Sequence, residues 1–130
     1  MALDVGKRII GVAIASMETG LVFPRDAIDQ KSNGIGQVLK IIKEEGIGKL
    51  IVGLPLNSDG SENEQCDYTK KFIKSLKLES IEVHYINEYG TSKEAEHRFK
   101  SMAFDKTIKR GTIDSTSASI ILETFLKRVI

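Results

Sequence analysis

Short apolar runs separated by turn residues open this chain, and apolar residues at helical spacing follow them. Ala2 to Val5 and Ile9 to Ala15 flank the turn Gly6-Lys7-Arg8 and predict two paired strands. Leu21 to Phe23 predicts a third strand. Pro24 should confine that strand to a sheet edge or end it, because proline has no amide hydrogen to offer a neighbouring strand. We therefore expect the fold to begin with three antiparallel strands.

Helical and strand-like segments alternate after this opening. The apolar spacing from Ile35 to Ile42 predicts a helix, and Lys49 to Leu54 predicts a buried strand. Ser61-Glu62-Asn63-Glu64 matches a capping box, in which Ser61 accepts a hydrogen bond from the Glu64 amide, so a second helix is expected to begin there. Ile81 to Ile86 predicts another strand. This order indicates an α/β domain.

Two more helices are expected in the C-terminal part of the chain. Thr91-Ser92-Lys93-Glu94 is a second capping box, and the apolar stripe from Ala118 to Val129 predicts the last helix. Asp114 is expected in the first turn of that last helix. There the helix dipole favours an acidic side chain, so a purely structural role for Asp114 needs no metal ion.

Composition and charge limit the classes of protein that fit. The 130 residues, 41% hydrophobic and 28% charged, suit one ordered domain spanning 1–130. With 19 basic against 18 acidic side chains there is no overall basic field, so nucleic acid would need a local patch. Cys66 has no second cysteine to pair with and is expected to be a packing residue. No apolar run is long enough to span a bilayer and no signal-like segment opens the chain, so we expect a cytoplasmic protein without membrane contact.

Acidic residues adjoin the ends of predicted strands and helices at three places, Asp4, Glu88 and Asp114. Folding should bring them to the edge of a core, where negative charge is costly unless something compensates it. A divalent cation is the simplest compensation, and hard carboxylate oxygens suit Mg²⁺ or Mn²⁺. The residues alone therefore indicate an acidic metal site.

Four segments together carry a more specific signal. They are Leu3-Asp4-Val5-Gly6 with Ile10-Gly11-Val12-Ala13, Val52-Gly53-Leu54-Pro55-Leu56-Asn57 with Asp59-Gly60-Ser61, Glu88 with Thr91, and Ile113-Asp114-Ser115 leading into Ala118 and Ile120-Ile121-Leu122. In this order and spacing they resemble the YqgF (RuvX-like) family over nearly the whole chain. The resemblance implies a ribonuclease H-like α/β fold, with a mixed sheet of three antiparallel and two parallel strands flanked by helices.

The resemblance also implies an activity and a set of site residues. Members of the family are described as Holliday junction resolvases and as the nuclease that matures the 5′ end of pre-16S ribosomal RNA. The family's acidic residues correspond to Asp4, Glu88 and Asp114. On this hypothesis two Mg²⁺ or Mn²⁺ ions assist phosphodiester hydrolysis, with Asp4 bridging the ions and the other two acids each completing one side.

The chain departs from the family pattern beside two of these motifs. The usual Asp-Glu-Arg triplet is Asn87-Glu88-Tyr89, which loses one negative and one positive charge. The basic residue that normally precedes Ile-Gly-Val-Ala is replaced by Ile9, with Arg8 one position earlier. A contribution of Arg8 would then have to come from the turn rather than from the strand.

Several residues are candidates for contact with nucleic acid. Lys106, Lys109 and Arg110 accumulate just before Asp114, where they could meet substrate phosphates or form a solvated loop. Asn57 could bind substrate or simply close the turn after Pro55. These alternatives are evenly balanced from the residues alone.

Rival hypotheses stay open at this point. The chain could be a non-catalytic maturation factor that binds ribosomal precursor particles, for which Asn87 and Tyr89 are the best support. A sugar kinase or actin-like ATPase, suggested by Asp4-Val5-Gly6 with Gly11, would need a second domain that 130 residues do not supply. Junction resolution would favour a homodimer able to make two cuts, whereas RNA end processing could use a monomer. We prefer RNA processing.

Overall fold

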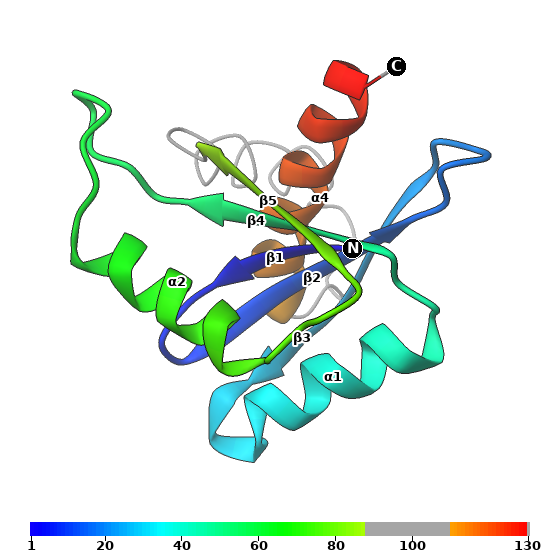
Figure 1. Ribbon diagram of the computed structural model, residues 1–130, viewed down its shortest axis with the longest axis horizontal. Helices are drawn as coiled ribbons and strands as arrows, with labels where there is room; N and C mark the ends of the chain where they lie inside the picture. Colours follow the sequence, from blue (N-terminus) through cyan, green and yellow to red (C-terminus); the bar gives the residue numbers. More distant parts are fainter. Residues whose placement is uncertain (88–109, 130) are drawn as a thin grey trace.

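Five strands form one mixed sheet in the order β3-β2-β1-β4-β5, with helices on both of its faces (Figure 1). The computed structural model describes residues 1–87 and 110–129, apart from the side chains of 110–114 and 129. The strands are β1 Ala2–Val5, β2 Ile9–Ala15, β3 Val22–Asp29, β4 Lys49–Leu54 and β5 Glu82–Asn87. The helices are the 3-10 helix η1 Gln30–Ser32, α1 Gly34–Glu44, α2 Glu64–Ser75 and α4 Arg110–Val129.

The strand directions are those that the sequence and the resemblance predict. β1, β2 and β3 are antiparallel neighbours, whereas β4 runs parallel to β1 and β5 runs parallel to β4. The predicted bounds of β1, β2 and β4 are confirmed without a shift. The carboxyl ends of β1, β4 and β5 therefore lie at one edge of the sheet, which is where α/β folds commonly place their binding sites.

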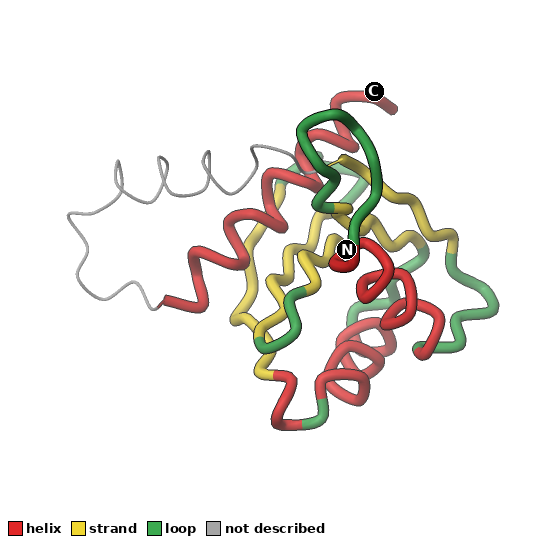
Figure 2. Tube along the Cα trace, turned by 90° about the vertical axis from the view of Figure 1, so that its left-hand side faces the viewer, coloured by secondary structure: helices red, strands yellow, loops and turns green. Residues whose placement is uncertain are grey.

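The two faces of the sheet are buried against different helices. Figure 2 shows α4 on one side of the strands and α1 with α2 on the other. The core under α1 and α2 includes Leu3, Val5, Ile10, Val12, Leu50, Val52, Val38, Ile42, Phe72 and Ile73. The core under α4 includes Ala2, Ala13, Ile51, Ile86, Ala118, Ile121, Leu122, Phe125 and Leu126. Because side chains alternate along a strand, each strand contributes to both cores.

The third strand is longer than predicted. β3 continues through Pro24 to Asp29, so the proline does not end it. Its place at the edge of the sheet is as predicted, since β3 pairs only with β2 in the part of the chain that the structure describes. An edge strand tolerates proline because the missing amide hydrogen can face away from the sheet.

The capping box predicted before the second helix is wrong. Asn63, not Ser61, is the N-cap of α2, and its side-chain oxygen accepts a hydrogen bond from the Cys66 amide at 3.0 Å. Ser61 instead donates its backbone amide to Asp59 at 2.9 Å within the preceding loop. Asparagine is as favourable an N-cap as serine, and Ser61 is instead bonded to Asp59 in the turn before the helix.

The position predicted for Asp114 in the last helix is also wrong. α4 begins at Arg110, and its first turn holds no acidic residue. Asp114 is the fifth residue of the helix, beyond the turn in which the dipole is felt most strongly. The purely structural explanation of Asp114 loses its support.

The prediction that Cys66 is a packing residue is confirmed. Cys66 is a free, buried cysteine, and Phe72 and Phe125 are buried in the two cores. The second capping box at 91–94 and the helix predicted from it lie outside the described residues. In the ranges that are described, no helix is both long and apolar enough to cross a membrane.

Candidate functional site

Asp4 lies on the face of the sheet that α4 covers. Its neighbours Leu3 and Val5 belong to the core under α1 and α2, whereas Ala2 belongs to the core under α4. Strand alternation therefore directs Asp4 to the same side as Ala2. Asp4 is only partly buried, unlike these three neighbours. The carboxylate thus stands at the border between the α4 core and solvent.

Glycines flank Asp4 on both neighbouring strands. Gly11 of β2 is paired directly with Asp4, and Gly53 of β4 comes one residue after the Leu3–Val52 pair. Both glycines are buried. A glycine inside a strand leaves room for another group to approach the sheet closely. The row Gly11, Asp4, Gly53 therefore places one carboxylate between two positions without side chains.

The turn after Asp4 is held in place by two glutamine side chains. Gln65 Nε2 donates to the Val5 carbonyl at 2.8 Å, and Gln30 Nε2 donates to the Gly6 carbonyl at 2.7 Å. Within the turn, the Gly6 amide donates to the Ile9 carbonyl at 3.0 Å. These hydrogen bonds tie the end of β1, just after Asp4, to α2 and to η1.

A β-bulge lies beside the same row of residues. From Ile10 to Val12 strand β2 advances by two residues, while β3 advances by three, from Ile28 to Arg25. The extra residue of β3 thus faces Gly11, the partner of Asp4. Bulges disrupt the ladder of backbone hydrogen bonds and are common next to functional sites.

Ser115 of α4 bonds to the backbone groups at this bulge. Its hydroxyl donates to the Arg25 carbonyl and accepts from the Val12 amide at 3.3 Å. Ser115 is fully buried. Because Ser115 follows Asp114 directly, these bonds fix the α4 backbone at position 114 above β2, next to the strand residue that faces Asp4.

The third predicted acid, Glu88, lies outside the described residues. It follows Asn87, the last residue of β5, which is exposed and paired with Leu54. Asn87 ends a strand parallel to β4 and β1. The described elements therefore lead the chain toward the same sheet edge immediately before Glu88.

The residues predicted to contact nucleic acid are described to different extents. Arg8 is exposed in the turn between β1 and β2, at the same edge as Asp4. Lys106 and Lys109 lie outside the described residues, and Arg110 is described only as the first residue of α4. For all four residues, phosphate contact stays a prediction.

Asn57 closes the turn after β4, one of the two roles considered for it. Its backbone amide donates to the Ser61 carbonyl at 2.9 Å, and its side-chain nitrogen donates to Ser61 Oγ at 3.0 Å. Its side-chain oxygen accepts from Asn63 at 3.0 Å. The side chain is exposed, so contact with a substrate is a separate question that these bonds leave as a prediction.

Two lysines near this edge were not singled out by the sequence. Lys7 follows Gly6 with its ammonium group 5.8 Å from the centre of the Tyr68 ring, and Lys31 is in η1, whose Gln30 amide donates to the Arg8 carbonyl at 2.9 Å. Lys7, Arg8 and Lys31 are all exposed, and none forms an ion pair with another described residue. A periodic pattern in the sequence could not reveal that Lys7, Arg8 and Lys31 lie at the same edge, because η1 meets the β1–β2 turn only in the folded chain.

The predicted metal centre is not tested by the described part of the chain. Among the side chains that are described, no three His, Cys, Asp or Glu residues form a cluster suited to a metal ion. Two of the three predicted ligands, Glu88 and Asp114, have side chains outside that set. What is described of Asp4, a partly buried oxygen ligand between two glycines, fits a hard divalent cation.

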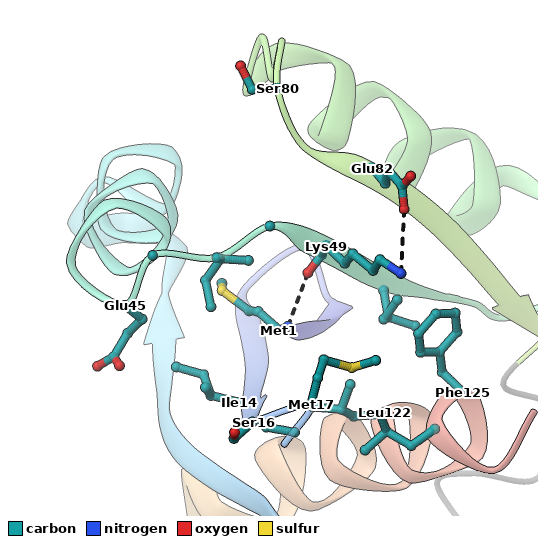
Figure 3. Close-up of a pocket in the computed structure, with 16 residues that line it drawn as sticks. Met1, Ile14, Ser16, Met17, Glu45, Lys49, Ser80, Glu82, Leu122 and Phe125 are labelled. Carbon is teal, nitrogen blue, oxygen red and sulfur yellow. Dashed lines mark hydrogen bonds and ion pairs between the residues drawn. The ribbon is translucent and has the colours of Figure 1, made fainter. Parts of the chain in front are cut away.

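A cavity of about 760 Å³ lies at the opposite end of the sheet (Figure 3). Its wall includes Met1, Met17, Leu122 and Phe125, and Lys49 and Glu82, at the amino ends of β4 and β5, form an ion pair at 3.7 Å beside it. Asp4 is not among its lining residues. This cavity is therefore separate from the acidic edge.

The sequence of this chain is similar to those of known proteins along nearly its whole length. The sequence model of the RuvX family, described as Holliday junction resolvase, matches residues 1–128. A protein of Sulfurihydrogenibium sp. is 35% identical over 99% of this chain and 90% of its own length. Similar proteins of Natranaerobius thermophilus and Thermus thermophilus are 34% and 32% identical over 98% of this chain and 93% and 96% of their own lengths. All three carry the name "Putative pre-16S rRNA nuclease".

Proposed function

Because this chain belongs to the RuvX family, we propose that it is a metal-dependent nuclease whose centre is built around Asp4. The observation that carries this proposal is the position of Asp4 between Gly11 and Gly53, on the strand whose carboxyl end meets those of β4 and β5. An acid beside two side-chain-free positions can hold a cation close to the sheet and leave space for a phosphate group.

Each proposed site residue has a role that its chemistry supports. Asp4, Glu88 and Asp114 supply oxygen ligands for Mg²⁺ or Mn²⁺, most simply for two ions. When bound, such ions supply an activated water and stabilise charge on the phosphate. β1, β4 and β5 all end at the edge where Asp4 lies, and the proposed centre would stand at that edge.

The basic residues at this edge would bind the phosphate groups of the substrate. Lys7, Arg8 and Lys31 are exposed cations on a turn whose backbone is fixed by hydrogen bonds, so phosphate contact would not require that turn to be ordered first. Lys106, Lys109 and Arg110, which precede Asp114 in the chain, would add further phosphate contacts. Any contact of Asn57 with the substrate would be made by its side chain, which is exposed.

The proposed substrate is the 5′ end of precursor 16S ribosomal RNA. The names of the similar proteins support this choice, and the description of the family supports branched DNA as the second candidate. Precursor ribosomal RNA would place the activity in the cytoplasm, on ribosomal precursor particles. Asn87 and Tyr89 favour a third outcome, a factor that binds RNA without cutting it, because they remove two charges next to Glu88.

Cleavage assays separate these outcomes. Labelled single-stranded RNA, single-stranded DNA, a four-way junction and an RNA carrying the 16S precursor 5′ end are incubated with Mg²⁺ or Mn²⁺. Asp4→Asn is compared with the parent and with Asp26→Asn, which changes an exposed aspartate on the edge strand β3. We expect metal-dependent cutting by the parent and by Asp26→Asn, and a loss of more than about a hundredfold in Asp4→Asn. Binding without cutting by the parent would overturn the nuclease and favour the maturation factor.

A further inference from the structure

Ser115 joins three elements at one point in the fold. It belongs to α4, its hydroxyl accepts from the Val12 amide of β2, and the same hydroxyl donates to the Arg25 carbonyl of β3. A hydroxyl group has one hydrogen to donate and lone pairs to accept with, so both kinds of bond are made at once. Ser115 is fully buried, as is Val12.

The bulge explains why a side chain is needed there. With one extra residue in β3 opposite Gly11, the regular ladder between β2 and β3 is interrupted between Ile10 and Val12. A buried backbone amide without a partner is costly, so the interruption requires a hydrogen-bonding group from another element. Ser115 supplies that group from the helix above the sheet.

Two other hydroxyl groups of α4 bond within the helix itself. Ser119 is also buried, but its hydroxyl donates to the Ser115 carbonyl at 3.0 Å, within the helix itself. Thr124 likewise bonds to the Ile120 carbonyl at 2.8 Å. Such bonds to the preceding turn leave the helix free to shift against the sheet as a unit. Of these three hydroxyl groups, that of Ser115 is the one that fixes α4 to particular strand residues.

The fixed point is connected through the backbone to two proposed site residues. Ser115 follows Asp114 in the chain, and its partner Val12 follows Gly11, which is paired with Asp4. We propose that Ser115 is a positioning residue, which uses the bulge to fix the α4 backbone next to Asp114 against the strand that pairs with Asp4. This inference rests on the proposed function and adds a residue that acts through Asp114 rather than on the substrate.

A positioning role predicts a defect in metal binding, because partners that orient a ligand commonly change metal affinity about 10- to 100-fold when they are removed. A role confined to stability predicts no such change. Ser115→Ala and the matched control Ser119→Ala therefore differ in expectation. Each removes one buried hydroxyl from the same helix, but only the first releases the bulge.

The experiment measures Mn²⁺ binding without substrate, by the loss of the free-ion electron paramagnetic resonance signal, in the parent, Ser115→Ala, Ser119→Ala and Asp4→Asn. We expect Ser115→Ala to weaken Mn²⁺ binding roughly 10- to 100-fold, while Ser119→Ala binds like the parent. In cleavage assays with saturating metal, kcat of Ser115→Ala should fall by up to about a hundredfold with KM for RNA little changed, because a misplaced ligand affects the chemical step.

The possible results separate the two proposals. Equal Mn²⁺ affinity in Ser115→Ala and Ser119→Ala, with Asp4→Asn inactive, overturns the positioning role and leaves the nuclease intact. Absence of both Mn²⁺ binding and cleavage in the parent overturns the proposed function and, with it, this inference. If Ser115→Ala does not fold, Ser115→Cys keeps the side-chain size with a weaker donor, and it should show the same weakening in smaller degree. Parent-like Mn²⁺ affinity in a folded Ser115→Cys would then count against the positioning role.

Discussion

Gly6, two residues after Asp4, offers a sharp test of the claim that the β1–β2 turn holds the site in place. A Cβ atom built on Gly6 would lie 2.5 Å from the Ile9 carbonyl oxygen, which belongs to the backbone. Real Cβ contacts below 3.0 Å are essentially never seen. Gly6→Ala therefore requires the turn to open by about 0.5 Å or more against the hydrogen bonds of Gln30 and Gln65.

The expected cost follows from this forced opening. Inserting a methyl group where backbone must move costs about 1–3 kcal/mol. With an unfolding entropy of about 2.1 cal/mol/K per residue, the 130-residue chain should lose about 7 °C in Tm for each 2 kcal/mol. A displacement of this size beside Asp4 should also reduce cleavage, by up to about a hundredfold for a shift approaching 1 Å.

Gly48→Ala is the matched control. Gly48 lies before β4, and a Cβ built there meets nothing within 4 Å. The substitution should be neutral or stabilise by up to about 1 kcal/mol, because it restricts the unfolded chain. Urea unfolding followed by circular dichroism measures both variants, and the cleavage assay is run in parallel. A Gly6→Ala variant as stable and active as Gly48→Ala would refute the reasoning.

Two further predictions concern Thr69 of α2 and the loop at Asp59. Thr69 is fully buried, and within the described structure its hydroxyl has no hydrogen-bond partner, so Thr69→Val should raise the free energy of unfolding by about 1 kcal/mol or more while Thr69→Ser lowers it. A fall in the urea midpoint of Thr69→Val would contradict this. The pKa of Asp59 is held below its usual 3.8 by the Ser61 hydroxyl and then by the Ser61 amide, so Ser61→Ala should raise that pKa in an NMR titration. The loop hydrogen bonds are present above the usual carboxyl pKa and are lost as pH falls through the folded-state value; an unchanged pKa in Ser61→Ala would show that the hydroxyl has no such effect.

Much of the fold could be predicted from the chain because its strands are short apolar runs with clear turn residues between them. Ala2–Val5, Ile9–Ala15 and Lys49–Leu54 are strands with these bounds. The length of β3 was underestimated because most of its residues after Phe23 are exposed, as an edge strand permits. Apolar and polar residues therefore alternate only weakly in that part of the strand. The N-cap of α2 was misplaced because Ser61 and Asn63 are both good caps, and only the folded loop shows that Asp59 engages Ser61.

The site was predictable only in part. The sequence singles out three acidic residues because each adjoins a predicted element boundary and a family motif. Asp4 lies at the expected sheet edge, and the metal-binding role of all three stays a prediction. The hydrogen bonds of Ser115 could not be predicted, because a bulge is a property of strand pairing and leaves no periodic trace in one strand. The same holds for Gln30 and Gln65, whose partners are carbonyl groups 24 and 60 residues away.

The measurement that tests the central claim most directly is the rate of Mg²⁺-dependent cleavage of an RNA carrying the 16S precursor 5′ end, by the parent, Asp4→Asn and Asp26→Asn. The account predicts cutting that requires the metal ion, persists in Asp26→Asn and falls more than about a hundredfold in Asp4→Asn, with the same Tm within a few degrees. Cleavage by Asp4→Asn at the parent's rate would contradict it.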